Sequence, residues 1–413
     1  MVAPDTFVEP AAAIRFTGEN GVFRRLITRG ALLELVTFGF YRFWLVTDIR
    51  RHLWSNTEVD GDALEYTGRG KELLLGALFA LAVLLPVFLL YFLAGLWLER
   101  FKAFASVPLY LVLYVFGQYA TFRARRYRLT RTIWHGVRFW MTGSGWAYAW
   151  RSVLWGLLAL VTLGFAYPWR AAALERYKMG NTRFGSLSGR FAGKGWVLFK
   201  SIWGIWLAGT IPWVLFGVAG LISLANSPQF GSFAYQLGYL GGIGPKGMMN
   251  LAFILGCFAL LALPFLHAVR IGNQWRWWVR GLRIGQAEVT SVLDWGQFVG
   301  IYWTVIGLFI LIYAGMILGG VLIGWGLVAV LGGASATMVI QSPWTIVPAA
   351  LTYVGLVQLF NAILRIYTQQ RIWKIVVGTS RIRNPELLTT AAAGMPASAL
   401  GEGLADGLDV TGF

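Results

Sequence analysis

The chain has 413 residues, of which 57% are hydrophobic and 13% are charged, and its formal net charge is +17. Uncharged apolar runs at residues 73–97 and 298–331 exceed the roughly 20 residues that cross a bilayer core, which excludes a soluble globular protein. The bases cluster beside such runs, as in the cytoplasmic loops of membrane proteins, which argues against a nucleic-acid partner. A single cysteine, Cys257, excludes an internal disulfide.

The N-terminal segment, residues 1–13, has no apolar core and is not a secretory signal peptide. The first apolar run follows at residues 30–47 and has bases on both sides. A crossing there would place bases on both faces of the membrane, and Glu34 and Arg42 would be costly in hydrocarbon. We therefore predict a short re-entrant or interfacial helix, because its charge-poor stretch is also shorter than a bilayer core.

The first run contains "LVTFGFYRFW" (35–44), which returns 125 residues further on as "LVTLGFAYPW" (160–169). The second copy lies in the run 147–168, which basic clusters again flank, and the same prediction applies to it. We expect the element to bend at Thr37 and Gly39, and at Thr162 and Gly164. Glycine permits a bend and a threonine hydroxyl can satisfy a freed carbonyl. The alternative is that these residues only let a short helix dock on the bundle.

Three hairpins then remain, at residues 73–122, 196–269 and 297–366, and each ends in a basic, aromatic-rich segment. We predict an all-α membrane bundle of three pseudo-repeats with six full spans and two short re-entrant or interfacial helices. The expected boundaries are 1–13 for a flexible N-terminus, 14–130, 131–275 and 276–383 for the three repeats, and 384–413 for a disordered tail.

The second motif copy, followed by "ERYKMGNTRFG" (174–184) and preceded by "RTIWHGVRFWMTGSGWAYAWRSV" (131–153), resembles the YjgN-like family of bacterial inner-membrane proteins. The resemblance covers roughly residues 14–382. The first copy departs from the pattern, with Phe38 in place of Leu and Phe43 where Pro168 stands. The resemblance implies a bacterial inner membrane and no established activity, so it supplies no catalytic residues.

No residue pattern typical of catalysis or metal binding stands out, so we expect no enzyme activity, metal or cofactor. Polar groups inside apolar runs are the better candidates, because each is costly in hydrocarbon unless it is paired. They could line a cavity, or they could face water or join neighbouring helices. The candidate cavity or bend residues are Glu34, Thr37, Gly39, Arg42, Gln118, Thr162, Gly164, His267 and Asn361.

Bases near the cytoplasmic ends of the hairpins are candidate contacts for anionic lipids, which such clusters attract. They are Arg123, Arg125, Arg126, Arg128, Arg276, Arg280, Arg283, Arg371 and Lys374. We expect a multi-pass inner-membrane protein with both termini in the cytoplasm that handles or transports a small solute or lipid through a cavity between repeats. The alternative is a structural or assembly partner that binds anionic lipids and other membrane proteins through its basic helices.

Overall fold

The computed structural model describes residues 11–97, 102–225, 245–331 and 343–391. The chain divides into two compact units. The first unit comprises Met1–Gly195, Trp278–Leu293 and Val305–Phe413, and the second comprises Trp196–Trp277 and Asp294–Thr304.

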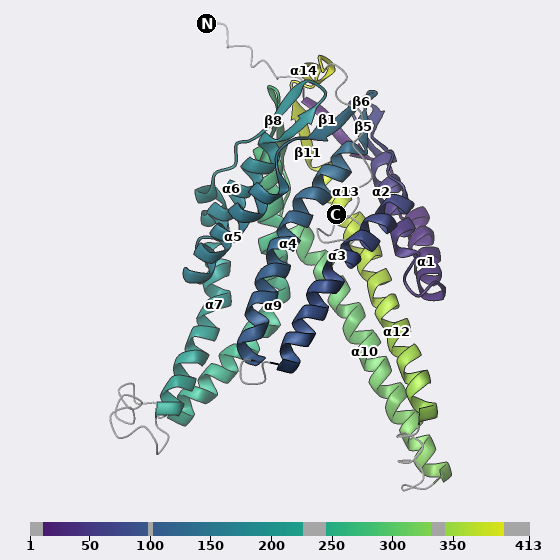
Figure 1. The fold of residues 1–413 in the computed structure, drawn as a ribbon, viewed down its shortest axis with the longest axis vertical. Helices are drawn as coiled ribbons and strands as arrows, with labels where there is room; N and C mark the ends of the chain where they lie inside the picture. Colours follow the sequence, from purple (N-terminus) through teal and green to yellow (C-terminus); the bar gives the residue numbers. More distant parts are fainter. Residues whose placement is uncertain (1–10, 98–101, 226–244, 332–342, 392–413) are drawn as a thin grey trace, which may run out of the picture. The chain divides into compact units, whose positions relative to one another are not determined.

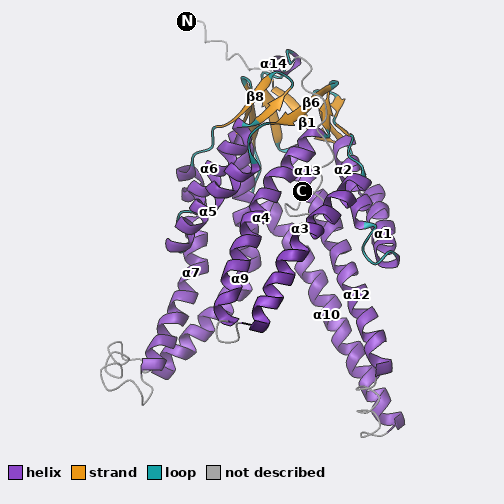
Figure 2. Ribbon diagram, in the orientation of Figure 1, coloured by secondary structure: helices purple, strands orange, loops and turns teal. Residues whose placement is uncertain are grey.

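An eleven-stranded antiparallel sheet organises the first unit, and its strands lie together at one end of that unit's own helices (Figure 2). The strand order is β3-β2-β1-β11-β10-β9-β8-β7-β6-β5-β4. The two end strands, β3 and β4, are separated along the chain only by Leu64, so the sheet nearly closes into a ring. The strands are β1 (Ala11–Phe16), β2 (Thr57–Val59), β3 (Asp62–Ala63), β4 (Glu65–Tyr66), β5 (Thr132–Trp134), β6 (Val137–Met141), β7 (Thr182–Phe184), β8 (Leu187–Phe191), β9 (Leu282–Ile284), β10 (Ala287–Ser291) and β11 (Ser380–Arg383).

Most helices lie in the connections between two strands that are hydrogen-bonded neighbours in the sheet (Figure 1). Thus α1–α2 joins β1 to β2, α3–α4 joins β4 to β5, and α5–α6 joins β6 to β7. Likewise α7 and α9 lie between β8 and β9, and α10, α12 and α13 between β10 and β11. The bounds are α1 (Asn20–Val36), α2 (Arg42–Ser55), α3 (Gly70–Trp97), α4 (Lys102–Thr130), α5 (Gly145–Val161), α6 (Tyr167–Gly180), α7 (Gly195–Ala225), α9 (Pro245–Gly281), α10 (Gly296–Leu331), α12 (Pro343–Leu364), the π-helix η2 (Arg365–Gln369), α13 (Gln370–Gly378) and α14 (Glu386–Thr389).

The ring has an apolar interior because alternate residues of its short strands face inward. The buried cluster takes side chains from five strands and one from α14, which follows β11. Its buried members are Val59, Trp134, Phe184, Ala287, Ile382 and Leu388. The C-terminal helix therefore contributes to the core of the ring.

Four helices, α2, α4, α6 and α13, end two residues before a threonine or serine that begins the next strand. The Oγ1 of Thr57 donates to the Leu53 carbonyl at 2.7 Å, which satisfies a carbonyl of the last turn of α2. Trp373 Nε1 in turn donates to Thr57 Oγ1 at 2.9 Å, and thereby ties α13 to β2. The side-chain hydroxyls of Thr132, Thr182 and Ser380 likewise each donate to the backbone carbonyl four residues earlier.

The predicted all-α fold of three pseudo-repeats with six full spans is wrong. The structure contains the eleven-stranded sheet, and helices form five of the connections between its described strands. Within the described ranges, three helical stretches are long and apolar enough to cross a membrane: Gly70–Ala94, Gly195–Val218 and Gly296–Val330. Helices α4 and α9 instead run on without a break into the basic segments that the prediction placed outside the spans.

The predicted disordered tail starts at residue 384, yet Glu386–Thr389 form α14 and Leu388 is buried. Apolar Leu388 gains by packing in the ring, since burial of a leucine side chain contributes about 1.5–3 kcal/mol. Residues 1–10 and 392–413 of the predicted flexible ends lie outside the described residues.

Candidate functional site

The first motif copy forms the sharp turn between α1 and α2. Phe38 and Gly39 have positive φ angles of 50° and 88° there, a conformation that glycine adopts readily. Thr37 Oγ1 donates to the Leu33 carbonyl at 2.6 Å and accepts from the Tyr41 amide at 3.0 Å. One hydroxyl thus joins the end of α1 to the start of α2, so the chain reverses without losing these backbone hydrogen bonds.

The second copy makes the same turn between α5 and α6. Leu163 and Gly164 have φ angles of 49° and 87°. Thr162 Oγ1 donates to Leu158 at 2.8 Å and accepts from the Ala166 amide at 3.1 Å. Helices α5 and α6 begin and end 125 positions after α1 and α2, so the two hairpins can be compared residue by residue.

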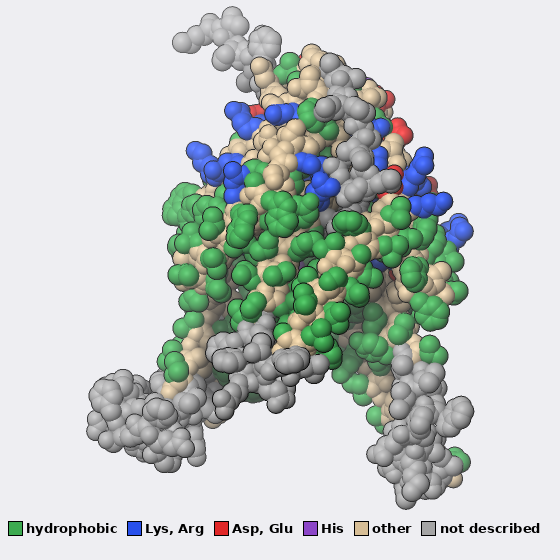
Figure 3. Space-filling model, viewed as in Figure 1, with side chains coloured by type: hydrophobic (Ala, Val, Ile, Leu, Met, Phe, Trp, Pro, Cys, Tyr) green, Lys and Arg blue, Asp and Glu red, His purple; other side chains and the backbone are tan. Residues whose placement is uncertain are grey.

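The tips of both hairpins are apolar and exposed. Phe38 exposes 92% of its surface and Leu163 exposes 72%. Figure 3 shows many hydrophobic side chains at the surface of the face that it draws. Exposed apolar tips are unfavourable in water but favourable in hydrocarbon, so the tips of both hairpins suit contact with a bilayer.

A cavity of about 550 Å³ lies between the first hairpin and helix α12 with its π-helical extension η2. Three aromatic residues, Phe38, Phe40 and Phe43, belong to its lining. Its polar groups come from both ends of the chain: Glu34 and Arg42 from the hairpin, and Gln358, Asn361 and Arg365 from α12 and η2. Four predicted residues, Glu34, Gly39, Arg42 and Asn361, therefore line one cavity.

An ion pair crosses this cavity. Arg365 donates through one guanidinium nitrogen to both oxygens of Glu34, at 3.1 and 3.3 Å. The Glu34 side chain is 4% exposed and that of Arg365 is 18% exposed. The buried Oε1 of Gln358 accepts no hydrogen bond from any described residue. Arg365 begins the π-helix η2, and π-helical turns within α-helices are frequent at functional sites.

The second hairpin has a corresponding cavity of about 510 Å³ against α4, but its lining is mostly apolar. Ala159 and Tyr167 occupy the positions of Glu34 and Arg42. Its Arg170 is held by Tyr114 at 2.8 Å and by Ser152 at 3.3 Å. The charged pair is therefore not required for the shared hairpin fold.

The remaining predicted residues lie elsewhere. Gln118 accepts a 2.8 Å hydrogen bond from Ser152 and so joins α4 to α5. His267 belongs to the second unit, where its ring packs edge-on against Tyr302 with centroids 5.1 Å apart. Neither residue lines the cavity of Glu34.

Most candidate lipid-binding bases make contacts within the protein. Arg125 lies 3.6 Å from Glu175, Arg283 lies 2.8 Å from Glu288, and Arg280 donates to the Ser291 carbonyl at 2.9 Å. Arg126 donates to the Gly143 carbonyl, Arg276 lies 3.4 Å from Asp294, and Arg371 stacks on Tyr367. Arg123 and Arg128 lie on α4, half-buried, and Lys374 is exposed on α13. Their contact with lipids stays a prediction.

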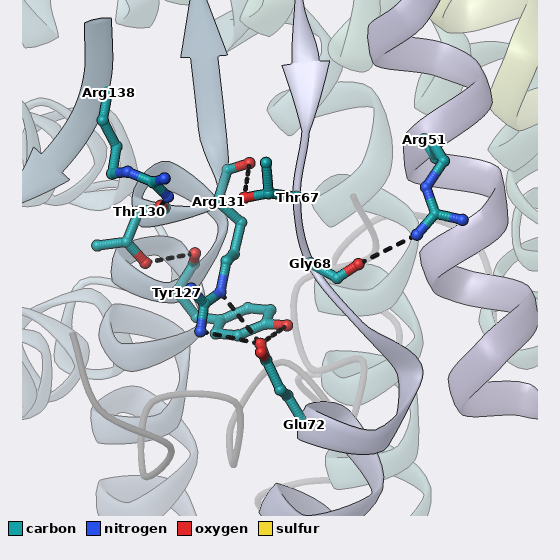
Figure 4. Close-up of polar contacts among 8 residues, drawn as sticks. All are labelled: Arg51, Thr67, Gly68, Glu72, Tyr127, Thr130, Arg131 and Arg138. Atoms are coloured by element: carbon teal, nitrogen blue, oxygen red, sulfur yellow. Dashed lines mark hydrogen bonds and ion pairs between the residues drawn. The ribbon is translucent and has the colours of Figure 1, made fainter. Parts of the chain in front are cut away.

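Two polar clusters were not predicted. Glu72, in the first turn of α3, accepts from Tyr127 at 2.8 Å and from Arg131 at 3.0 Å, which joins the start of α3 to the end of α4 (Figure 4). Glu175 forms an ion pair with Lys178 and accepts from Trp278 at 3.1 Å. Burial raises the pKa of Glu175, but Lys178 and Arg125 outweigh it and hold this pKa below its usual range. Both clusters join helices.

Three apolar helical stretches and two helical hairpins with exposed apolar tips define a membrane-associated protein. Residues 11–406 match the family described as "Bacterial protein of unknown function (DUF898)", and the chain belongs to this family. This membership agrees with the resemblance to YjgN-like proteins. No curated protein and no solved structure matches the chain.

Proposed function

We propose that this chain is a multi-pass protein of the bacterial inner membrane that binds the polar part of a lipid or small amphiphilic solute. The binding site is the cavity between α1–α2 and α12. The observation that carries this proposal is the Glu34–Arg365 ion pair in a cavity with aromatic residues in its lining. Such a lining suits a ligand with a polar group and an apolar part, because each part finds a matching environment.

The comparison between the two hairpins supports a function for the charged residues that line the first cavity. Both hairpins have the same threonine-glycine turn, but only the first has an acid at the position of Glu34, which Ala159 occupies in the second. Buried ion pairs are weak stabilisers, and well-packed apolar residues often replace them without loss. A ligand role gives a reason for the pair that packing alone does not give.

The arrangement of strands supports the orientation. Strand β1 pairs with both β2 and β11, so the first and last described strands lie in the same sheet. The strands of this sheet contain seven arginines: Arg15, Arg138, Arg183, Arg190, Arg283, Arg381 and Arg383. Such bases mark the cytoplasmic side of bacterial membrane proteins. Both termini then lie in the cytoplasm, and α1–α2 enters the membrane from that side and returns. We propose a non-enzymatic role for the site.

The test is the set of amphiphiles that co-purify with the full chain in a mild detergent, identified and counted by mass spectrometry. The variant Glu34→Gln/Arg365→Gln removes both charges and keeps similar side-chain volumes. The matched control, Tyr114→Phe/Ser152→Ala, alters the second cavity. We expect one amphiphile to be lost from the first variant and kept by the control. An unchanged set of bound molecules in the first variant would contradict the proposal.

A second candidate function is a structural or assembly role in a membrane complex. It is favoured by exposed aromatic residues on α5, where Trp146 and Trp150 expose 50% and 59% of their surfaces. Aromatic residues are enriched at protein interfaces. Co-isolation of a stoichiometric protein partner, lost in Trp146→Ala/Trp150→Ala but kept in Glu34→Gln/Arg365→Gln, would favour this role over the first.

A further inference from the structure

A second cavity, of about 670 Å³, opens on a different side of the α1–α2 hairpin and takes no part in the proposed function. Arg29 of this cavity and Glu34 of the first are five residues apart on α1, about 140° around the helix. Arg25 and Arg29 of α1 and Arg51 of α2 line it, with Asp48 as its acid. Three arginines and one aspartate leave a net charge of +2 at this cavity.

The arginines differ in how they are held. Arg51 donates to the Asp48 carboxylate and to the Gly68 carbonyl, both at 3.3 Å, and the second of these bonds is drawn in Figure 4. Arg25 and Arg29 are exposed and make no direct hydrogen bond or close ion pair with another described residue, although burial raises the pKa of Asp48 and the charge of Arg29, like that of Arg51, acts to lower it. Their guanidinium donors therefore have no protein acceptor among the described residues. Guanidinium groups match the geometry of phosphate oxygens and bind them through paired hydrogen bonds.

His52 adds a neutral donor to the same lining. Asn56 Nδ2 donates to the His52 carbonyl at 2.7 Å, which fixes the orientation of the amide. The same nitrogen lies 3.4 Å from His52 Nδ1, so Nδ1 is the acceptor and the proton of the neutral ring is on Nε2. Burial lowers the pKa of His52 and favours this neutral form. The buried Nε2 has no hydrogen-bond partner among the described residues.

The second hairpin shows that these bases are not needed for the fold. Trp150 and Leu154 stand where the first hairpin has Arg25 and Arg29, and Ala173 stands in the place of Asp48. The hairpins nevertheless have the same helix bounds and the same turn. The positive charge is thus a special property of the first hairpin.

We propose that this basic cavity binds the phosphate group of an anionic phospholipid. Arg25 and Arg29 donate to the phosphate oxygens, while Asp48 and Gly68 hold Arg51 in place beside them. A lipid fits better than free phosphate because the same hairpin ends in the exposed Phe38. From Arg29 to Val36, where α1 ends, the helix rises about 10 Å, and the turn with Phe38 follows, so the tip can reach most of the ~15 Å hydrocarbon depth of one leaflet. A headgroup at the bases therefore leaves its acyl chains beside the apolar tip.

The experiment is a titration of the purified full chain in detergent micelles, with bound lipid counted by native mass spectrometry. The probes are phosphatidylglycerol, phosphatidylcholine and inorganic phosphate as a competitor. The test variant is Arg25→Gln/Arg29→Gln. The matched control is Arg24→Gln/Arg176→Gln, which removes two exposed bases outside the cavity. Thermal unfolding of each variant, followed through tryptophan fluorescence, confirms that it is folded.

We expect the wild-type chain to retain one phosphatidylglycerol in preference to phosphatidylcholine, and the test variant to bind it at least about tenfold more weakly, since two charge-assisted contacts are lost. The control should bind like the wild type, and millimolar phosphate should not displace the lipid. Equal binding by the test variant and the wild type would overturn the proposal. So would an equal loss in the control, which would indicate a general charge effect. Full displacement by inorganic phosphate would show that the ligand is free phosphate rather than a lipid.

Discussion

Removal of one partner from the Glu34–Arg365 pair should destabilise the protein more than removal of both. Glu34→Gln keeps the volume of the side chain but leaves the Arg365 guanidinium without its carboxylate. That carboxylate is 4% exposed and receives both hydrogen bonds of the pair, at 3.1 and 3.3 Å. Loss of one partner from a buried ion pair typically costs about 3–5 kcal/mol, because the other charge stays buried and unpaired.

The expected magnitude lies at the lower end of this range. The Arg365 side chain is 18% exposed, so water can partly solvate the guanidinium once the carboxylate has gone. We expect the free energy of unfolding to fall by about 3 kcal/mol in Glu34→Gln, and by about 1 kcal/mol in Glu34→Gln/Arg365→Gln, where no unpaired charge remains. The double variant should therefore be more stable than the single one.

The assay is a denaturant titration of the purified chain in mixed micelles, followed through its 21 tryptophans. A double-mutant cycle with Arg365→Gln gives the coupling energy between the two side chains. Arg176→Gln, which removes an exposed base from α6, is the control and should change stability by less than about 0.5 kcal/mol. The reasoning would be refuted if the losses of stability in Glu34→Gln and Arg365→Gln simply added up in the double variant. A double variant less stable than Glu34→Gln would refute it as well.

Three further predictions concern the hairpin turns, the ring and pH. Gly39→Ala and Gly164→Ala should each destabilise the chain by about 1–2 kcal/mol and by similar amounts, because both residues have φ near +88°; unequal effects in the same titration would contradict equivalent turns. Thr57→Val should lower the free energy of unfolding by about 1–3 kcal/mol, since it leaves Trp373 Nε1 without its acceptor. A variant with a blue-shifted tryptophan emission and no loss of stability would contradict this prediction. Because the folded pKa of Glu175 is lowered, its stabilisation is present above the unfolded pKa of about 4.3 and is lost as pH falls toward the folded value. Glu175→Gln should lack this acid-dependent loss in melting curves between pH 6 and 3, and an unchanged pH profile would argue against the assignment.

The local features could be predicted from the sequence. The motif with Thr37 and Gly39 marks a turn because the conformational freedom of glycine and the hydroxyl of threonine act within one turn of helix. The short, charge-flanked runs around the two motif copies correspond to the short helices α1–α2 and α5–α6. These properties depend on neighbours along the chain, so a single sequence carries them.

The sheet could not be predicted because its strands are only two to six residues long and pair with distant segments. Strand β1 pairs with β11, more than 360 residues away along the chain. Among the inward residues, Trp134 lies in a basic segment that was predicted to be a cytoplasmic helix, and Phe184 lies in a basic connection between two apolar runs. Their alternation with polar residues and the glycine-containing turns, such as His135-Gly136, were the available signal for hairpins.

The candidate site was predicted only in part for the same reason. Glu34, Arg42 and Asn361 were singled out as polar groups in apolar runs, but their meeting in one cavity depends on the packing of α1 against α12. Arg365 was placed in a basic cytoplasmic segment because it neighbours other bases along the chain. Its role as the partner of Glu34 became visible only from the three-dimensional contact.

The most direct test of the account is cysteine accessibility of the first hairpin in intact cells. In a Cys257→Ser background, Ser55→Cys reports the end of α2 and Phe38→Cys reports the tip. We expect neither to react with a membrane-impermeant maleimide added outside, and Ser55→Cys to react after the membrane is opened. Phe38→Cys should react only with a lipid-soluble maleimide. Reaction of Phe38→Cys or Ser55→Cys with the impermeant reagent in intact cells would show that the hairpin reaches the outer side and would contradict the account.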